Sequence, residues 1–295
     1  MSTHTLTRVR DWTSALQPEL HHLWLDARPS DAGTTARHIR SSLQEYGFAL
    51  VRGFDADGNT REAVSGTLGP VAQRLGPVVP QNYQGSMLED IRDFSDTEAF
   101  DNRGYRSPGE LSLHTDPPTL IVLYCLQPAR SGGENQLVNM GAIHAAMQQQ
   151  RSDLLPHLYR GCRYWVPSET TAGEGRASDW KRPVLMLRDG QVSCVYYRPY
   201  IELAAKAANE PLTSAQTEAL DCFDTLASTP RFQIRFTLAA GEAVVLHNRA
   251  VMHARSDYED WPDARMRRHL LRWWIDAPDI RPTPPEHCLG NYFGT

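Results

Sequence analysis

The stretch LSLHTDPPTLIVLYCL, residues 111–126, decides the fold because a polar motif passes directly into a long apolar run. Residues 119–126 (TLIVLYCL) lie between turn signals, which indicates a buried strand. Just before this run, His114 and Asp116 stand two residues apart, and in an extended segment such residues project to the same side. The imidazole and the carboxylate can therefore converge on one ion, although two donors alone do not make a metal site.

A candidate third donor lies in the C-terminal part of the chain, within GEAVVLHNRAVMHARSDYEDWPDARMRRHLLRWWID at 241–276. His253 follows a predicted strand and the short connection HNRAV. Two imidazoles and one carboxylate that leave coordination positions open are typical of non-haem Fe(II) oxygenases. The sequence therefore predicts a metal site made by His114, Asp116 and His253, with His247 as the rival for the third position.

Outside these segments the chain mixes helical patterns with short strand patterns. Residues 34–46 predict a helix that Gly47 ends, and Asp189-Gly190 predicts the turn of a hairpin over 184–197. The stretch 55–107 predicts long loops with one short helix at 60–68. Further helices are expected at 140–158, 199–208 and 213–228, and further strands at 48–53, 135–139, 161–167, 231–238, 243–247, 250–254 and 268–276.

This order of elements predicts a mainly β protein with flanking helices. Many short strands after an early helix favour a double-sheet core, expected over about 47–276, with a helical insertion at about 199–228. The sequence shows no repeat and no low-complexity linker. We therefore expect one domain over 1–295.

The composition favours a small molecule as the binding partner. The 295 residues carry a net charge of −5, whereas nucleic-acid and membrane-surface proteins need concentrated positive charge. The five cysteines form no CxxC pair, so neither a disulfide framework nor a thiolate zinc site is indicated. The sequence has neither a secretory signal nor a long apolar run, and a cytoplasmic location is expected.

Taken together, the motifs resemble those of the taurine dioxygenase (TauD/TfdA-like) family of Fe(II)- and 2-oxoglutarate-dependent oxygenases. The resemblance runs from about residue 47 to residue 276 and rests on several motifs in the same order. These are His114-Thr115-Asp116, the Gly132-Gly133-Glu134 turn, Asn248-Arg249 ahead of His253, and Arg268 with Arg272. The resemblance implies a double-stranded β-helix, the cupin-like jelly roll, with iron at one mouth of the barrel.

The resemblance also implies how the cofactors are held. It assigns Fe(II) to His114, Asp116 and His253, with 2-oxoglutarate and O2 as co-substrates. It assigns the distal carboxylate of 2-oxoglutarate to Arg268, because a planar guanidinium can hold a carboxylate through two charge-assisted bonds. Arg267 is the alternative, although on an extended strand it would face the other way.

Two further positions follow from the same resemblance. Asn135 stands where taurine dioxygenase has a threonine that helps to hold 2-oxoglutarate, and an amide can also donate a hydrogen bond. Members that use sulfonates bind the substrate anion with an arginine at the place of Arg272. Arg272 could instead pair with a structural carboxylate.

The implied activity couples the decarboxylation of 2-oxoglutarate to succinate and CO2 with oxidation of a second substrate. C–H hydroxylation of a small polar or anionic, amino-acid-like or natural-product molecule is the default outcome. Desaturation, cyclisation or epoxidation would use the same residues, whereas the Asp116 ligand disfavours halogenation. A catalytically silent metal- or ligand-binding barrel is the alternative outside enzymology, and assembly into a homo-oligomer is left open.

Further residues are candidates for the substrate pocket because they lie near the predicted barrel mouth. Tyr105, Arg106 and Glu110 precede the metal motif, and Tyr197 and Arg198 end the hairpin. Each could equally be a packing or solvated loop residue. The polar segment 167–180 fits either a lid over the iron or a surface loop.

Overall fold

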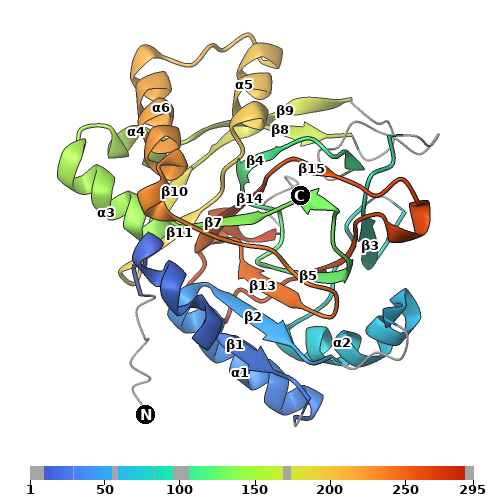
Figure 1. The fold of residues 1–295 in the computed structure, drawn as a ribbon. Coiled ribbons are helices and arrows are strands. Elements are labelled where there is room, and N and C mark those ends of the chain that lie inside the picture. The colour runs from blue at the N-terminus through green and yellow to red at the C-terminus, as the bar shows by residue number, and fades with distance from the viewer. Residues whose placement is uncertain are drawn as a thin grey trace.

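Two β-sheets that face each other form the centre of the molecule, and helices lie outside both (Figure 1). The computed structural model describes residues 10–28, 30–54, 59–82, 84–95, 106–168 and 174–289. Sheet A has six strands in the order β1-β2-β13-β5-β16-β3, and sheet B has four in the order β12-β7-β14-β4. The chain passes repeatedly between the two sheets, as the predicted jelly roll requires.

The strands of both sheets are short, and most come from the predicted core. Sheet A contains β1 (Trp24–Asp26), β2 (Phe48–Arg52), β3 (Leu88–Ile91), β5 (Leu120–Gln127), β13 (Ala243–His247) and β16 (His269–Ile275). Sheet B contains β4 (Leu111–His114), β7 (Asn135–Asn139), β12 (Gln233–Phe236) and β14 (Val251–Arg255). Three two-stranded pairs complete the set: β6 (Ser131–Gly132) with β15 (Tyr258–Glu259), β8 (Cys162–Pro167) with β9 (Gly175–Arg182), and β10 (Leu185–Arg188) with β11 (Gln191–Cys194).

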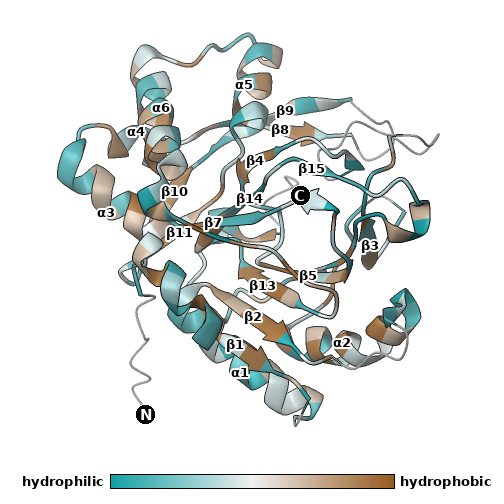
Figure 2. Ribbon diagram, viewed as in Figure 1, coloured by the Kyte–Doolittle hydropathy of each residue, from teal (hydrophilic) through white to brown (hydrophobic). Residues whose placement is uncertain are grey.

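The helices divide between the outer faces of the two sheets. One apolar cluster joins α1 (Ala32–Tyr46) and α2 (Arg61–Leu75) to sheet A. A second joins sheet B to α3 (Met140–Gln150), α4 (Leu155–Arg160), α5 (Arg198–Ala207) and α6 (Ser214–Ser228). A third fills part of the space between the sheets and also packs η1 (Ser14–His22). Figure 2 shows the hydrophobic character of β2 and β13 within these layers.

The alternation of side chains along β16 shows how sheet A separates two environments. Leu271 and Trp273 pack in the cluster beneath α1 and α2, whereas Leu270 and Trp274 pack in the cluster between the sheets. Because successive residues of a strand point to opposite faces, Arg272 also points between the sheets. This inner space is where the polar site residues gather.

Several predicted elements are confirmed with small shifts. Gly47 ends α1 in the left-handed conformation at φ 79°, and Asp189 and Gly190 form the hairpin turn at φ 51° and 73°. The helical insertion is α5 and α6, and Thr213 with Gln216 makes a capping box at the start of α6. The last strand begins at His269, so Arg268 lies just outside it, next to a register shift at His269/Leu270.

Other predictions are wrong in extent. The short helix at 60–68 continues to Leu75 through Gly66, Gly69 and Pro70, because its apolar face is buried against sheet A and packing outweighs weak propensity. The helix expected at 140–158 is two helices, with a break after Gln150. Strand pairing also begins before residue 47, since β1 pairs with β2, and β3 lies within the stretch predicted as loops.

The segment 167–180, for which a lid and a surface loop were both left open, is in part regular structure. Residues from Gly175 onward form β9, which pairs antiparallel with β8. Residues 169–173 lie outside the described residues. Separately, a search of the described helices for one long and apolar enough to cross a membrane finds none.

Candidate metal centre

The three predicted ligands meet between the two sheets. His114 ends β4 and His253 lies on β14, and the antiparallel register places the two residues directly opposite each other. Their ring centroids are 4.2 Å apart, and Asp116 follows two residues after His114. One donor atom from each residue lies within 4.8 Å of the others, and all three residues are buried. Within the described ranges, this is the one group of three His, Cys, Asp or Glu residues with such spacing.

A hydrogen bond prepares His114 for a metal ion, and burial prepares His253. The Nδ1 of His114 lies 2.8 Å from the carbonyl oxygen of Ser112, so Nδ1 carries the hydrogen and Nε2 offers its lone pair. That Nε2 is 3.9 Å from Asp116 Oδ1, and His253 Nε2 is 3.8 Å from Asp116 Oδ2. Burial, with a smaller effect of His114, lowers the pKa of His253 to about 3, so this imidazole is neutral at pH 7.

Asp116 is ionised although it is buried. Burial alone would raise its pKa, but the nearby charge of Arg272 holds the pKa below its usual value. Among the residues described, Asp116 Oδ2 has no hydrogen-bond partner. A buried charged oxygen that accepts no hydrogen bond is costly, and a cation between the three donors would satisfy it. Two imidazoles and one carboxylate therefore fit Fe(II) with open coordination positions.

Asn248 and Arg249 hold the backbone that carries Asp116. Asn248 Oδ1 accepts from the Asp116 amide at 3.3 Å, and its Nδ2 donates to the Pro118 carbonyl at 3.0 Å. Arg249, almost fully buried, donates to the carbonyls of Asp116 and Pro117 and to that of His287. The sequence contained this motif, but the structure supplies its role, which is to fix the turn after the metal motif.

His247, the rival ligand, lies outside the donor group. It is fully buried on β13, and its Nδ1 accepts from the Arg249 amide at 3.3 Å. The contacts of His247 therefore face the Arg249 backbone, and the structure favours His253 as the third donor.

Arg268 belongs to a second polar group, which it forms with Tyr258 and Arg255. Its guanidinium carbon is 5.1 Å from the centre of the Tyr258 ring, and Arg255 stacks on the same ring at 4.7 Å. A Cβ at Gly133 would lie 3.4 Å from Arg268 Nε, so the Gly-Gly turn leaves room for this side chain. Burial lowers the pKa of Arg268, yet a guanidinium remains charged at neutral pH. No described residue accepts a hydrogen bond from its buried Nη1.

This cluster fits a carboxylate ligand, and it favours Arg268 over Arg267. Arg268 is 5% exposed, whereas Arg267 is only half-buried. Asn135 lies on the inner face of β7 opposite Arg255, and its Nδ2 donates to the Phe236 carbonyl at 3.3 Å. Its predicted contact with 2-oxoglutarate remains a prediction.

Arg272 reaches the triad itself. Its Nη1 is 3.6 Å from Asp116 Oδ2, and its Nε donates to Gln81 Oε1 at 2.8 Å. Gln81 Nε2 in turn donates to the Arg272 carbonyl at 2.6 Å. The sequence left two roles open for Arg272, and the structure places it where it can both orient Asp116 and meet a substrate.

The remaining substrate candidates fall in different places. The ring of Tyr197 lies 5.7 Å from that of His114, so this residue borders the triad. Arg198 instead points to α6 and its own helix, where its three guanidinium nitrogens donate to Glu202, Asp221 and Asp224. Arg106 stacks on Phe94 at 4.7 Å, and Glu110 is exposed ahead of β4. Tyr105 lies outside the described residues.

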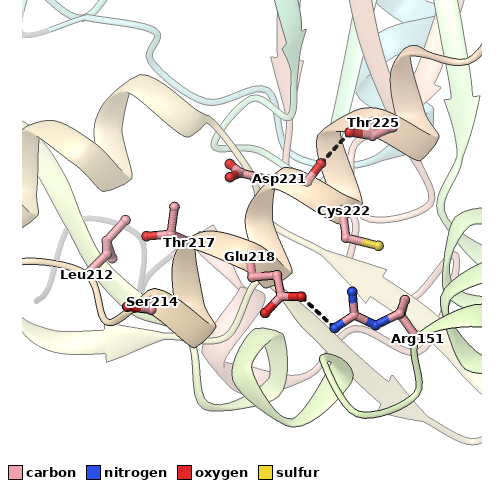
Figure 3. Close-up of a pocket in the computed structure, with 8 residues that line it drawn as sticks. All are labelled: Arg151, Leu212, Ser214, Thr217, Glu218, Asp221, Cys222 and Thr225. Carbon is pink, nitrogen blue, oxygen red and sulfur yellow. Dashed lines mark hydrogen bonds and ion pairs between the residues drawn. The ribbon is translucent and has the colours of Figure 1, made fainter.

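A surface hollow of about 560 Å³ lies along α6, and none of the three triad residues lines it (Figure 3). Its lining residues are Arg151, Leu212, Ser214, Thr217, Glu218, Asp221, Cys222 and Thr225. The charge of Arg151 is matched by Asp153 and Glu218 at 2.8 and 2.7 Å. The charge of Arg151 is therefore already compensated within the protein, and the candidate site remains the group between the sheets.

Sequence reasoning missed Gln81, Glu89 and Tyr258, all of which lie around the site. Gln81 and Glu89 fall in the stretch predicted as loops, where the four residues of β3 are too few for a clear alternation. Tyr258 belongs to the two-residue strand β15, in a segment predicted as a polar loop. Only its position shortly after His253 could have drawn attention to it.

Comparison with known proteins agrees with this geometry. The family described as "Taurine catabolism dioxygenase TauD, TfdA family" matches residues 9–274. FR-33289 synthase of Streptomyces rubellomurinus is 29% identical, over 81% of this chain and 71% of its own length. The uridine-5'-phosphate dioxygenase of Amycolatopsis sp is 30% identical, over 81% and 89%.

Solved structures show the same fold at lower identity. Asparagine oxygenase in complex with Fe(II), 2S,3S-3-hydroxyasparagine and succinate superposes with a TM-score of 0.67 at 16% identity, over 83% of this chain and 79% of the other. The non-heme iron oxygenase OrfP with Fe and alpha-ketoglutaric acid gives 0.62 at 14% identity, over 90% and 85%. At these identities the likeness is one of fold.

Proposed function

The chain belongs to the TauD, TfdA family of dioxygenases, and from this premise we propose that it hydroxylates a C–H bond of a small polar or anionic molecule. It is a non-haem iron enzyme whose co-substrates are 2-oxoglutarate and O2. When bound, these supply the oxidation, in which 2-oxoglutarate leaves as succinate and CO2 and one oxygen atom enters the substrate. The observation that carries the proposal is the buried triad, in which Asp116 Oδ2 accepts no hydrogen bond from a described residue.

We propose that the chain's residues divide this work between two neighbouring groups. His114, Asp116 and His253 would hold Fe(II), and the Ser112 carbonyl keeps His114 in the tautomer that can bind it. Arg268 would bind the distal carboxylate of 2-oxoglutarate, with Asn135 as a further donor. The support is that Arg268 is buried and charged and that its Nη1 has no acceptor among the residues described. A bidentate carboxylate would satisfy it.

Arg272 and Tyr197 are the proposed boundary with the primary substrate. Arg272 lies beside Asp116, and Tyr197 lies beside His114. A cation at this point favours substrates with an anionic group. The same residues would serve desaturation, cyclisation or epoxidation, since the outcome depends on which substrate carbon faces the metal.

We further propose that residues 1–295 act as one domain, in the cytoplasm, on a small molecule and not on nucleic acid or a membrane. Sheet A joins strands from near both ends of the described chain, which supports one domain. The net charge of −5 supports a small-molecule partner. Assembly into a homo-oligomer stays open.

The proposal is tested by replacing Asp116. We expect Asp116→Ala to lose both bound iron, measured by metal analysis, and succinate formation from 2-oxoglutarate. The matched control is Asp179→Ala, since the Asp179 side chain is 90% exposed and pairs with the surface residue Arg176. Iron content and succinate formation that both survive in Asp116→Ala would contradict the triad. Failure of the wild type to consume 2-oxoglutarate with iron, ascorbate and a broad substrate panel would favour a silent barrel.

A further inference from the structure

A buried carboxylate on β3 faces the space between the sheets. Along β3, Leu88 packs toward the α1–α2 side and Asp90 pairs with Arg61 at the start of α2. Ile91 packs in the cluster between the sheets. Because side chains alternate along a strand, Glu89 points to the same inner side as Ile91, and it is only 7% exposed.

Glu89 is the direct cross-strand neighbour of Arg272. The antiparallel register pairs the two residues, so both project from the same face of sheet A. The Cβ atoms of such a pair lie about 4.5–5.5 Å apart. Arg272 Nη1 is 3.6 Å from Asp116 Oδ2. Glu89 is therefore the neighbour of a residue that contacts one of the predicted metal ligands.

Among the described residues, Glu89 accepts a hydrogen bond but forms no ion pair. Its Oε1 accepts from Asn82 Nδ2 at 2.7 Å. The orientation of the Asn82 amide is fixed because its Oδ1 accepts from the amides of Gln84 and Ser86. In the described part of the chain, no lysine, arginine or histidine forms an ion pair with Glu89 within 4.0 Å. Arg272 directs its Nε to Gln81 and its Nη1 toward Asp116.

A buried carboxylate with one neutral donor is costly unless a cation completes it. We propose that Glu89 receives a protonated amine of the primary substrate, next to the anionic group that Arg272 attracts. This inference rests on the proposed function and specifies its substrate class as small zwitterions, such as an amino acid, aminophosphonate or aminosulfonate. An ammonium group brings three donors, and its charge-assisted hydrogen bond to a carboxylate is stronger than a neutral one.

The spacing agrees with this class. An opposite cross-strand pair presents an acid and a base side by side, and small zwitterions carry their amine and their anion only a few bonds apart. A purely anionic substrate would leave Glu89 uncompensated and would face its repulsion. The pair Glu89 and Arg272 should therefore select for the amine as well as for the anion.

The test uses probes that differ only in the amine. L-Asparagine is compared with succinamate, and 2-aminoethylphosphonate with ethylphosphonate. Binding to protein loaded with Fe(II) and 2-oxoglutarate is measured by calorimetry without oxygen. We expect at least one aminated probe to bind the wild type at least about tenfold more tightly than its partner. This comparison needs no variant, and equal binding within both pairs, or no binding by any probe, would overturn the inference.

The variant Glu89→Gln then tests whether the preference for the aminated probe depends on Glu89. The amide oxygen can still accept from Asn82, so the turn is kept while the charge is removed. We expect the preference for the aminated probe to disappear, with little change for the deaminated one. Asp90→Asn is the matched control because it removes a neighbouring charge from the outer face, and it should keep the preference. A variant that weakens both members of a pair equally would assign Glu89 a structural role only.

The same measurements separate this inference from the proposed function. Binding of Fe(II) and of 2-oxoglutarate is assigned to the triad and Arg268, not to Glu89. If the protein consumes 2-oxoglutarate but shows no preference for the amine, only the inference about Glu89 fails. If it binds neither iron nor 2-oxoglutarate, the proposed function itself fails.

Discussion

Arg268 and Arg198 are both withdrawn from solvent, but their surroundings differ. Arg198, on α5, donates from Nε, Nη1 and Nη2 to three carboxylates at 2.7–3.0 Å. Arg268 stacks on Tyr258, and within the described residues its Nη1 has no acceptor. The folded protein supplies carboxylates for the charge of Arg198, whereas the hydrogen bonds of Arg268 are incomplete. A buried charge that lacks a partner is costly unless a ligand supplies one, so the contrast supports the binding role proposed for Arg268.

Removing Arg268 should have the largest effect. Truncating one partner of a buried charge pair costs about 2–5 kcal/mol, so the Kd of 2-oxoglutarate in Arg268→Ala should rise at least about 30-fold. The Kd is measured by calorimetry on the Fe(II) protein without oxygen, alongside the melting temperature. Arg267→Ala is the matched control and should stay near the wild-type Kd. A normal Kd in Arg268→Ala, with a raised one in Arg267→Ala, would exchange their roles.

His287 resembles Arg198 because both of its ring nitrogens have hydrogen-bond partners within the protein. Replacing His287 should therefore affect stability and not ligand binding. Its Nδ1 accepts from Ser193 Oγ at 2.7 Å, and its Nε2 donates to the Pro183 carbonyl at 2.9 Å. Burial, ahead of the charge of Arg249, lowers the pKa of His287 to about 3. Below pH 6.5, His287 therefore binds a proton in the unfolded chain but not in the folded protein. The free energy of unfolding falls as the pH falls. The His287 contribution is about 2 kcal/mol between pH 6.5 and 5.

The measurement is urea unfolding of the metal-free protein at pH 7 and pH 5. In His287→Gln the amide can keep the bond to Pro183, but nothing titrates, so the loss between the two pH values should be smaller by about 2 kcal/mol. The other buried histidines contribute equally to both proteins and cancel. The same pH dependence in wild type and variant would show that His287 does not resist protonation.

Arg198→Ala should have the smallest effect. Partly exposed ion pairs contribute little each, so we expect a loss of about 1 kcal/mol in the free energy of unfolding. The KM values for 2-oxoglutarate and substrate should stay within about twofold, since all three nitrogens of Arg198 are occupied by α5 and α6. A large rise in the substrate KM without loss of stability would return Arg198 to the substrate pocket, as the sequence suggested.

The sequence predicted those features that depend on local pattern. The apolar run at 119–126 and the motif around His114 indicated a buried strand and a donor pair, and both exist. The hairpin at Asp189-Gly190 and the helix end at Gly47 follow from backbone chemistry that few other residues allow. The sequence predicted His253 as the third donor but not its position opposite His114, because pairing between distant strands leaves no local signal.

The features that the sequence missed are those that depend on distant contacts. The four residues of β3 form a strand through their pairing with β16, which is distant in the sequence. Glu89 is a candidate for substrate binding only because this pairing places it opposite Arg272. Arg198 was a substrate candidate because it follows the hairpin, but the acids of α6 that bind it come later in the chain. Side-chain partners of this kind are decided by tertiary structure.

The register between β14 and β4 has a thermodynamic consequence for the apoprotein. Both imidazole donors belong to neighbouring hydrogen-bonded strands, and Asn248 and Arg249 hold the turn that carries Asp116. The coordination sphere is thus preorganised by the backbone and does not have to be assembled by the ion. Little of the metal's binding free energy is then spent on ordering the chain, in contrast to small domains that fold only around their metal. Chelation should leave a folded protein that reloads with iron, and other divalent ions should enter the same cage and act as inert occupants.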